Sequence, residues 1–230
     1  MAIFLDTSKI NEIEKYHRMG ILRGVTTNPT IMLKDGITGG LEGIKQQTVR
    51  IARMIAPYPV SVEVTTNDPV EMTRQAREFA RWADNVVVKI TIHGPNGELE
   101  NLEVVHDLET LHGVQVNVTA MMSAQQCLLA AMAGASYVSI FGGRVNNMGY
   151  NVSDEIVKLR KVLDAQDLKA KIIVGSTREV LNIIEWLEAG AHIVTTVPNL
   201  LEGMIVHPYS KETVKMFLED ASKTEAALKK

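Results

Sequence analysis

Val86-Val87-Val88-Lys89-Ile90 is a short, almost wholly β-branched run that carries one charged side chain. An apolar run of this length, without the alternation of a half-exposed sheet, is typical of a strand in a parallel sheet covered on both faces. The segment before it, Pro69 to Trp82, has helical spacing of its apolar residues. A helix paired with a buried strand predicts an α/β fold, and the architecture depends on how often this pair recurs.

The same alternation runs along the whole chain. Strands are expected at Ile3 to Leu5, Gly24 to Thr27, Val60 to Thr65, Val86 to Ile90, Val114 to Val118, Tyr137 to Phe141, Lys171 to Gly175 and His192 to Thr196. Helices are expected at Lys9 to Met19, Ile44 to Ile55, Pro69 to Trp82, Ala124 to Ala133, Asp154 to Leu163, Glu179 to Glu188 and Leu200 to Val206. The chain therefore reads as a series of βα units.

Eight expected strands in 230 residues favour a closed (β/α)₈ barrel, a fold that takes roughly 250 residues. The alternative is an open doubly wound sheet, which would carry a glycine-rich nucleotide turn after its first strand. Asp6-Thr7-Ser8 is not such a turn. We expect one domain over residues 1–230, with residues 210–230 as an additional C-terminal helix that packs over the barrel or against a neighbouring subunit.

Residues that begin and end helices support these assignments. Gly20, Gly134 and Gly190 fit the C-terminal ends of three helices, where glycine accepts a left-handed backbone. Ser123 and Ser153 are expected as N-caps.

Composition excludes several classes of function. The formal charge of -3 and pI of about 6.1 provide no basic field for nucleic acid. No apolar run is long enough to cross a membrane, and the start lacks a secretory signal, so a cytoplasmic protein with no membrane partner is expected. Cys127 is the only cysteine and the six histidines show no ligand spacing, so neither a disulfide nor a metal site is expected.

In barrels of this kind, side chains from the C-terminal ends of the strands converge on the active site. Polar or aromatic groups lie at or near nearly all of the expected strand ends, at Asp6, Thr26 to Asn28, Glu63, Lys89, Asn117, Thr119, Ser139, Phe141 and Ser176. The sequence therefore predicts one polar site at this end of the barrel.

Lys89 is the most informative of these residues. Its amine could reach solvent or pair with a structural carboxylate; alternatively, burial favours the neutral amine, which attacks a ketone to form a Schiff base. Asp6 and Glu63 would supply the proton acceptor and donor that such chemistry needs, or would only pair with Lys89. Arg144 and Arg178 follow the sixth and seventh strands beside candidate helix N-termini, which suggests an anion pocket.

The motifs also match a known family. The matching segments are Phe4-Leu5-Asp6-Thr7, Gly24-Val25-Thr26-Thr27-Asn28-Pro29-Thr30, Val60-Ser61-Val62-Glu63-Val64, Val87-Val88-Lys89-Ile90, Asn117-Val118-Thr119, Tyr137-Val138-Ser139, Gly143-Arg144 and His207-Pro208. In this order, over almost the whole chain, they resemble the small transaldolases and fructose-6-phosphate aldolases. The Thr-Thr-Asn-Pro segment together with the lysine of the fourth strand is specific to that family.

The resemblance implies a role for each candidate. Lys89 would form the Schiff base, Asp6 would be the acid/base for the hydroxyl next to the cleaved bond, and Glu63 with Thr119 would activate the catalytic water. The expected substrate-binding residues are Thr27, Asn28, Asn117, Ser139, Phe141, Arg144, Ser176 and Arg178. No metal or organic cofactor is needed, because the protonated imine is the electron sink. The family also forms rings of five and pairs of rings, so a homo-oligomer, up to a decamer, is expected.

Differences within the family bear on the reaction and the substrate. Glu63, Asn117 and Phe141 match transaldolases, which keep the three-carbon enamine until an aldehyde acceptor arrives, and not aldolases, which release dihydroxyacetone. The loop Thr91 to Glu98 is longer and more polar than usual, and Gly142 and Thr177 replace family residues beside the arginines. The donor therefore stays open between fructose 6-phosphate and a sulfonate such as 6-deoxy-6-sulfofructose. A non-catalytic sugar-phosphate binder is the alternative from another class.

Overall fold

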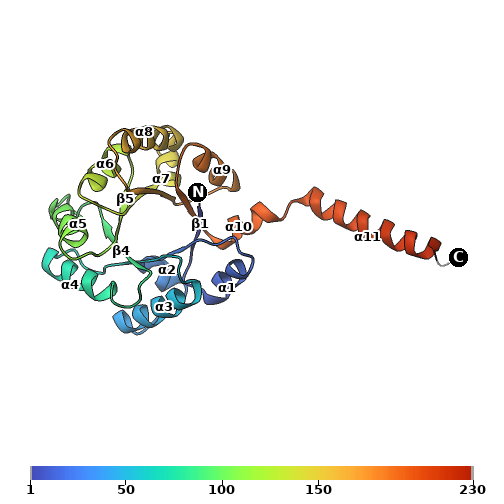
Figure 1. The fold of residues 1–230 in the computed structure, drawn as a ribbon, viewed down its shortest axis with the longest axis horizontal. Helices are drawn as coiled ribbons and strands as arrows, with labels where there is room; N and C mark the ends of the chain where they lie inside the picture. The colour runs from blue at the N-terminus through green and yellow to red at the C-terminus, as the bar shows by residue number, and fades with distance from the viewer. Residues whose placement is uncertain (1, 229–230) are drawn as a thin grey trace.

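Parallel strands close into a barrel in the computed structural model, which describes residues 2–228 (Figure 1). The strands are β1 (Ala2–Asp6), β2 (Val25–Thr26), β3 (Val60–Glu63), β4 (Val86–Thr91), β5 (Val116–Met121), β6 (Tyr137–Phe141), β7 (Lys171–Gly175) and β8 (Ile193–Thr196). Each pairs with its neighbour in sequence, and β8 closes the barrel against β1, with Ala2 opposite Ile193. The expected (β/α)₈ architecture is confirmed, and the open sheet is excluded.

Helices surround the barrel in a ring, and the last helix extends away from it (Figure 1). They are α1 (Ile10–Arg18), α2 (Pro29–Lys34), α3 (Gly40–Ile55), α4 (Pro69–Phe79), α5 (Glu100–Thr110), α6 (Ala124–Met132), α7 (Gly142–Asn147), α8 (Val152–Ala165), α9 (Val180–Glu188), α10 (Pro198–Ile205) and α11 (Pro208–Leu228). Three of these, α2, α5 and α7, were not expected from the sequence. Two of the three, α2 and α7, are single short segments that directly follow strands β2 and β6.

The expected glycine ends are confirmed, because Gly20, Gly134 and Gly190 have φ of +72°, +106° and +109°. Ser123 is confirmed as an N-cap, since its side chain accepts a hydrogen bond from the Gln126 amide at 3.3 Å. Ser153 is not an N-cap. The helix begins one residue earlier, and Asn151 caps it by accepting from the Ser153 amide at 3.1 Å.

The main hydrophobic core fills the layer between strands and helices, where large side chains such as Trp186, Phe79 and Tyr16 have no exposed surface. A separate apolar cluster occupies the inside of the barrel toward the amino ends of the strands, and it consists of Phe4, Val87, Tyr137, Ile173 and Ile193. Gly24 is required beside this cluster, because a Cβ there would lie 2.5 Å from the Phe4 ring. We call these five residues the barrel floor.

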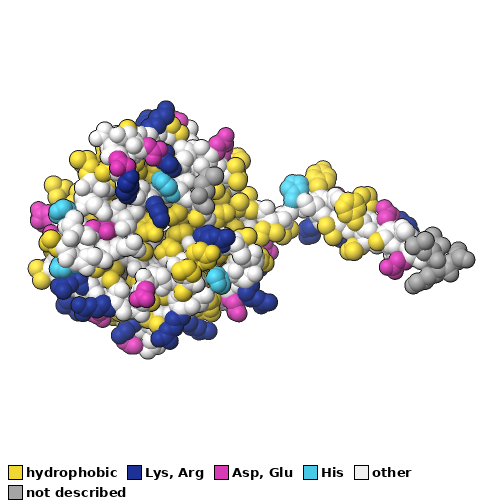
Figure 2. All heavy atoms as spheres, in the orientation of Figure 1, with side chains coloured by type: hydrophobic (Ala, Val, Ile, Leu, Met, Phe, Trp, Pro, Cys, Tyr) yellow, Lys and Arg dark blue, Asp and Glu magenta, His cyan; other side chains and the backbone are white. Residues whose placement is uncertain are grey.

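α11 projects away from the barrel (Figure 1), and apolar atoms are visible along it in the space-filling view (Figure 2). It begins at Pro208, two residues before the expected Ser210, while Lys229 and Lys230 lie outside the described residues. All side chains described on this helix are exposed, including Tyr209, Val214 and Phe217. Among residues 2–228 there is no helix with the length and apolar character needed to span a bilayer.

Candidate active site

A cavity of about 510 Å³ lies at the carboxyl ends of the strands, a size suited to a small ligand. It brings together nearly all of the residues that the sequence singled out, namely Asp6, Asn28, Glu63, Lys89, Asn117, Thr119, Ser139, Phe141, Arg144, Ser176 and Arg178. Ile173 of the barrel floor also lines the cavity, so that its base is apolar while its walls are polar.

Lys89 is held between neighbouring strands at the bottom of the polar wall. The register of β3, β4 and β5 puts Glu63, Lys89 and Asn117 side by side. The Lys89 Nζ lies 3.2 Å from Glu63 Oε2, and the side chains of the pair are only 6% and 19% exposed. The amine also donates to the Thr27 carbonyl at 3.0 Å. These contacts fix the amine against the cavity and place a proton acceptor beside it.

Thr27 was grouped with the substrate-binding residues, but the structure gives it a different place. It is fully buried, it is not part of the cavity wall, and its hydroxyl donates to the Ser61 carbonyl at 2.8 Å. Because its own carbonyl accepts from Lys89, Thr27 anchors the lysine to β3. The expected contact of Thr27 with substrate is therefore replaced by a contact with the amine of Lys89.

Asp6 ends β1 on the same cavity wall as Lys89. Burial raises the pKa of this carboxyl above its usual value, and the opposing attraction of Lys89 and the hydrogen bond from Thr26 do not cancel that effect. A buried carboxyl with a raised pKa next to a lysine is a candidate for a group that takes up and returns a proton during a reaction.

Asn117 is the centre of a buried hydrogen-bond chain across β3, β5 and β6. Its side-chain oxygen accepts from the Ser139 hydroxyl at 2.6 Å, and its side-chain nitrogen donates to the Ser61 hydroxyl at 3.2 Å. The orientation of the amide is fixed, which leaves its second N–H for a ligand. Thr119 is 1% exposed, and its hydroxyl has no hydrogen-bond partner within the described part of the chain.

Close packing brings the two arginine segments together. A Cβ on Gly143 would collide with the Ser176 carbonyl and lie 2.9 Å from Arg178 Cγ, and a Cβ on Gly142 would lie 2.8 Å from the Trp186 ring. Both glycines are therefore explained by packing of α7 against the end of β7. The result is that Arg144 and Arg178 project over the same side of the cavity.

The structure changes the expected anion contacts. Arg144 lies in the first turn of α7, and its guanidinium lies over the Phe141 ring, 5.0 Å from the ring centroid. The amides of Arg178 and Glu179 both donate to the Asn182 side chain, at 3.3 and 3.1 Å, so they are not free to bind an anion. The side chains of the two arginines and of Ser176 line this wall and are groups that could hold an anion.

Several residues in the cavity wall were not predicted as site residues. Thr30, Ile31 and Lys34 come from α2, and Thr195 comes from β8. The Thr-Thr-Asn-Pro motif leads directly into α2, so the signal for Lys34 was its position five residues after that motif. Thr195 was included in an expected strand, but its inward direction was not assigned.

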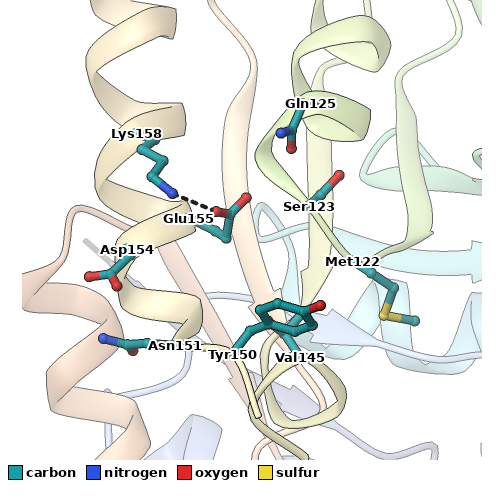
Figure 3. Close-up of a pocket in the computed structure, with 9 residues that line it drawn as sticks. All are labelled: Met122, Ser123, Gln125, Val145, Tyr150, Asn151, Asp154, Glu155 and Lys158. Atoms are coloured by element: carbon teal, nitrogen blue, oxygen red, sulfur yellow. Dashed lines mark hydrogen bonds and ion pairs between the residues drawn. The ribbon is translucent and has the colours of Figure 1, made fainter. Parts of the chain in front are cut away.

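A smaller hollow of about 330 Å³ lies outside the barrel between α6, α7 and α8 (Figure 3). Its main charged pair, Glu155 and Lys158, is 2.9 Å apart, and Glu155 also accepts from the Ala124 amide at the start of α6. Lys158 therefore pairs with Glu155, and Glu155 also accepts a hydrogen bond at the first turn of α6. Cys127 of α6 is fully buried, and burial raises the pKa of its thiol, so it is a core residue and not a nucleophile.

The chain is similar to known proteins over almost its whole length. A family model described as transaldolase/fructose-6-phosphate aldolase matches residues 3–230. A probable transaldolase 2 from Listeria monocytogenes is 40% identical over 96% of this chain and 95% of its own length. A probable transaldolase from Dehalococcoides mccartyi is 37% identical, with 96% and 97% covered.

Solved structures of low identity share only the barrel. A putative phosphonomutase from Burkholderia cenocepacia has a TM-score of 0.60 at 15% identity, covering 95% of this chain and 93% of the other. A thiamine phosphate pyrophosphorylase from Pyrococcus furiosus has a TM-score of 0.59 at 10% identity, with 85% of each chain covered. Since one fold serves many reactions, these two carry no argument about chemistry.

The burial of Asp6 leads to a prediction about stability. Asp6→Asn should raise the free energy of unfolding at neutral pH, because it removes a carboxylate that burial disfavours. The pKa of Asp6 in the folded protein lies above the unfolded value of about 3.9, so the wild type loses stability as the pH rises through the folded pKa. Below about pH 3.9 the carboxyl is protonated in both the folded and the unfolded protein, and this effect is absent. The gain should therefore be present at pH 7 and disappear toward pH 3. Urea unfolding at one protein concentration measures it, with exposed Asp154→Asn as control; a less stable Asp6→Asn at pH 7 would contradict the argument.

Proposed function

Because the chain belongs to the transaldolase/fructose-6-phosphate aldolase family, we propose that it transfers a dihydroxyacetone unit between sugars through a Schiff base on Lys89. The observation that carries the proposal is the amine of Lys89, buried at the base of the cavity between Glu63 and the Thr27 carbonyl. A binding module needs no such amine with a proton acceptor beside it.

In the first step the amine attacks the ketose carbonyl carbon, C2. The amine has to be neutral to attack, and Glu63 Oε2 at 3.2 Å is in place to accept its proton. Loss of water from the carbinolamine then forms the protonated imine. Thr119 and Glu63 would hold this water as it leaves, and would hold a water again when the imine is hydrolysed, since both residues line the cavity and the Thr119 hydroxyl has no hydrogen-bond partner within the described chain.

In the second step Asp6 removes the proton from the C4 hydroxyl. The C3–C4 bond breaks, the C4 aldehyde leaves, and the electron pair of the bond moves into the protonated imine to give an enamine. Asn28, Asn117 and Ser139 would bind the hydroxyls of the retained three-carbon unit, because all three line the cavity near Lys89. The enamine then attacks an acceptor aldehyde such as glyceraldehyde 3-phosphate, and the steps run in reverse.

We propose transfer over release of free dihydroxyacetone. The transaldolase-type residues Glu63, Asn117 and Phe141 all lie in the cavity wall, where they would contact the substrate or the residues that bind it. Turnover of donor without acceptor separates the two reactions: accumulation of free dihydroxyacetone at the rate of donor use would assign an aldolase.

A ketose with a terminal anion is the proposed donor. Arg144, Ser176 and Arg178 lie together at one side of the cavity, away from the bond that breaks. The backbone amides of Arg178 and Glu179 are already bonded to the Asn182 side chain, so these two amides would not add to the contacts that the three side chains make with the anion. A pocket with fewer donors suits a sulfonate, which carries one charge, as well as a phosphate, which carries nearly two.

The Schiff base can be tested directly. Treatment of the protein with a ketose donor and borohydride should add the reduced sugar to Lys89, as seen by peptide mass mapping. Lys89→Met should lose both the adduct and turnover while remaining folded, because an unbranched apolar side chain fits the buried site. Asp6→Ala should keep the adduct but lose about 100-fold or more in cleavage rate. Wild-type protein that gains no mass on Lys89 would remove the proposal.

The anion site gives a second prediction. Arg178→Ala should raise KM for fructose 6-phosphate by about 10- to 100-fold, because a charge-assisted contact contributes roughly 1.5 to 3 kcal/mol when desolvated. KM for uncharged fructose should change little, and this substrate is the control. On the wild type, kcat/KM for fructose 6-phosphate and for 6-deoxy-6-sulfofructose identifies the better donor. Equal effects of Arg178→Ala on charged and uncharged ketoses would show that the arginine does not hold the anion.

We also propose that α11 packs against a second copy of the chain in a closed homo-oligomer. Val214, Phe217 and Leu218 lie on one face of the helix and are 55%, 62% and 68% exposed. Apolar side chains at this spacing need a partner surface, and a helix that projects from its own barrel can reach only another molecule. Head-to-tail contacts of this kind close into a ring, and the family resemblance favours rings of five.

Light scattering on the intact protein tests the assembly. Phe217→Glu and a chain that ends at Tyr209 should both shift the protein toward monomer, because each removes apolar contact area from the helix. Lys223→Glu changes charge on the opposite face of α11 and should leave the assembly intact. A monomeric wild type at micromolar concentration would exclude the proposed role of α11.

A further inference from the structure

A short hydrogen-bond chain inside the barrel ends on the Asp6 carboxylate. Thr26 donates its hydroxyl to Asp6 Oδ1 at 2.6 Å, and the hydroxyls of Thr26 and Thr195 are 2.5 Å apart. Thr26 is 3% exposed and Thr195 6% exposed, and both line the cavity. The chain therefore crosses from β8 to β2 and then to the end of β1, in a place where water does not compete for it.

We propose that Thr195 is a positioning residue for Asp6: through Thr26 it fixes Oδ1 as a hydrogen-bond acceptor and leaves Oδ2 to exchange the proton with the substrate. This inference rests on the proposed function only in assigning Asp6 as the acid/base. The arrangement of the hydroxyls and the carboxylate is independent of any reaction.

The number of protons determines the direction of the chain. A hydroxyl has one proton, and a carboxylate oxygen can only accept. Since Thr26 gives its proton to Asp6 Oδ1, the contact between the two threonines must be a donation from Thr195 to Thr26. Thr195 is thus the source of a chain that points toward Asp6.

This direction remains valid when Asp6 gains or loses a proton. No hydrogen bond to Oδ2 is present among residues 2–228, so a proton on that oxygen does not disturb the chain. A proton on Oδ1 would instead require both hydroxyls to turn. Proton transfer at Oδ2 therefore needs no rearrangement of the barrel interior, which lowers its reorganisation cost.

Packing holds Thr195 in the rotamer that the chain needs. Gly175 on the neighbouring strand lies beside its methyl group, and a Cβ on Gly175 would be 3.2 Å from Thr195 Cγ2. With the methyl against β7, the hydroxyl faces Thr26. Valine at position 195 would keep the shape of the side chain and remove only the donor.

The charged groups that face Asp6 come from three other elements. Lys89 of β4 favours the carboxylate, whereas Asp35 beyond α2 and Glu63 of β3 disfavour it. Within the described residues, the hydrogen bond to Oδ1 comes from Thr26, while Lys89 pairs with Glu63 and the Thr27 carbonyl. A change at Thr195 therefore alters the Asp6 carboxyl through Thr26 without removing any of these charges.

Three variants test the inference in the intact protein. Thr195→Val removes the donor, Thr195→Ser keeps it, and Thr48→Val is the matched control, since Thr48 is fully buried in α3 and its hydroxyl has no partner within the described chain. The measurements are kcat and KM for donor cleavage across pH, borohydride trapping on Lys89, and titration of the Asp6 carboxyl by ¹³C NMR with Asp6→Asn for assignment.

Thr195→Val should lower kcat by about 3- to 10-fold, as expected for one hydrogen bond, with KM and trapping on Lys89 unchanged. Loss of a donor that stabilises the carboxylate raises the pKa of Asp6, so the acidic limb of the kcat profile should move to higher pH. Thr195→Ser keeps the donor but lacks the methyl that packs against β7, so it should lose much less kcat than Thr195→Val, and Thr48→Val should follow the wild type.

A wild-type kcat and pH profile for Thr195→Val would overturn the inference, as would equal losses in the valine and serine variants, which would indicate packing alone. Failure of the proposed function is a separate result, namely no adduct on Lys89 of the wild type. In that event the NMR titration still applies: an Asp6 midpoint in Thr195→Val that equals the wild type would reject the hydrogen-bond chain.

Discussion

The placing of one lysine amine inside an apolar barrel is the constraint on which the rest of the site depends. An ammonium group taken out of water is costly unless charged and polar partners replace its hydration. Glu63 and the Thr27 carbonyl are those partners, and each is held in turn, Glu63 by its place in β3 and Thr27 by its bond to Ser61. The register of the strands thus supplies both the solvation of the amine and the proton acceptor beside it.

Glycines at the mouth of the barrel meet a different requirement, that of bringing segments close together. Gly142 leaves room for Trp186, and Gly143 leaves room for the Ser176 carbonyl. Because Ser176 itself has a left-handed backbone with φ of +60°, the end of β7 turns sharply where α7 approaches it. The position of the two arginines is therefore a consequence of main-chain packing, even though the contact with a ligand would be made by their side chains.

The barrel and most of the site follow from patterns that the sequence carries locally. A polar residue at the end of a buried strand is expected to face the mouth of a closed barrel, and this rule alone predicts that Asp6, Glu63 and Lys89 lie together. The rule fails for Thr27, whose side chain at the strand end turns to Ser61. The rule also does not predict that the side chain of Asn182, in the first turn of α9, accepts hydrogen bonds from the backbone amides that follow β7. Such contacts depend on the three-dimensional approach of segments, and α2 and α7 are too short for a periodic pattern to reveal them.

The barrel floor has a consequence for the order of events. Phe4, Val87, Tyr137, Ile173 and Ile193 close the interior beneath Lys89, so traffic to and from the amine passes only through the mouth. In the proposed transfer, the leaving aldehyde and the incoming aldehyde would share this single opening. The first would have to depart before the second could approach, and the three-carbon unit would stay on Lys89 in between.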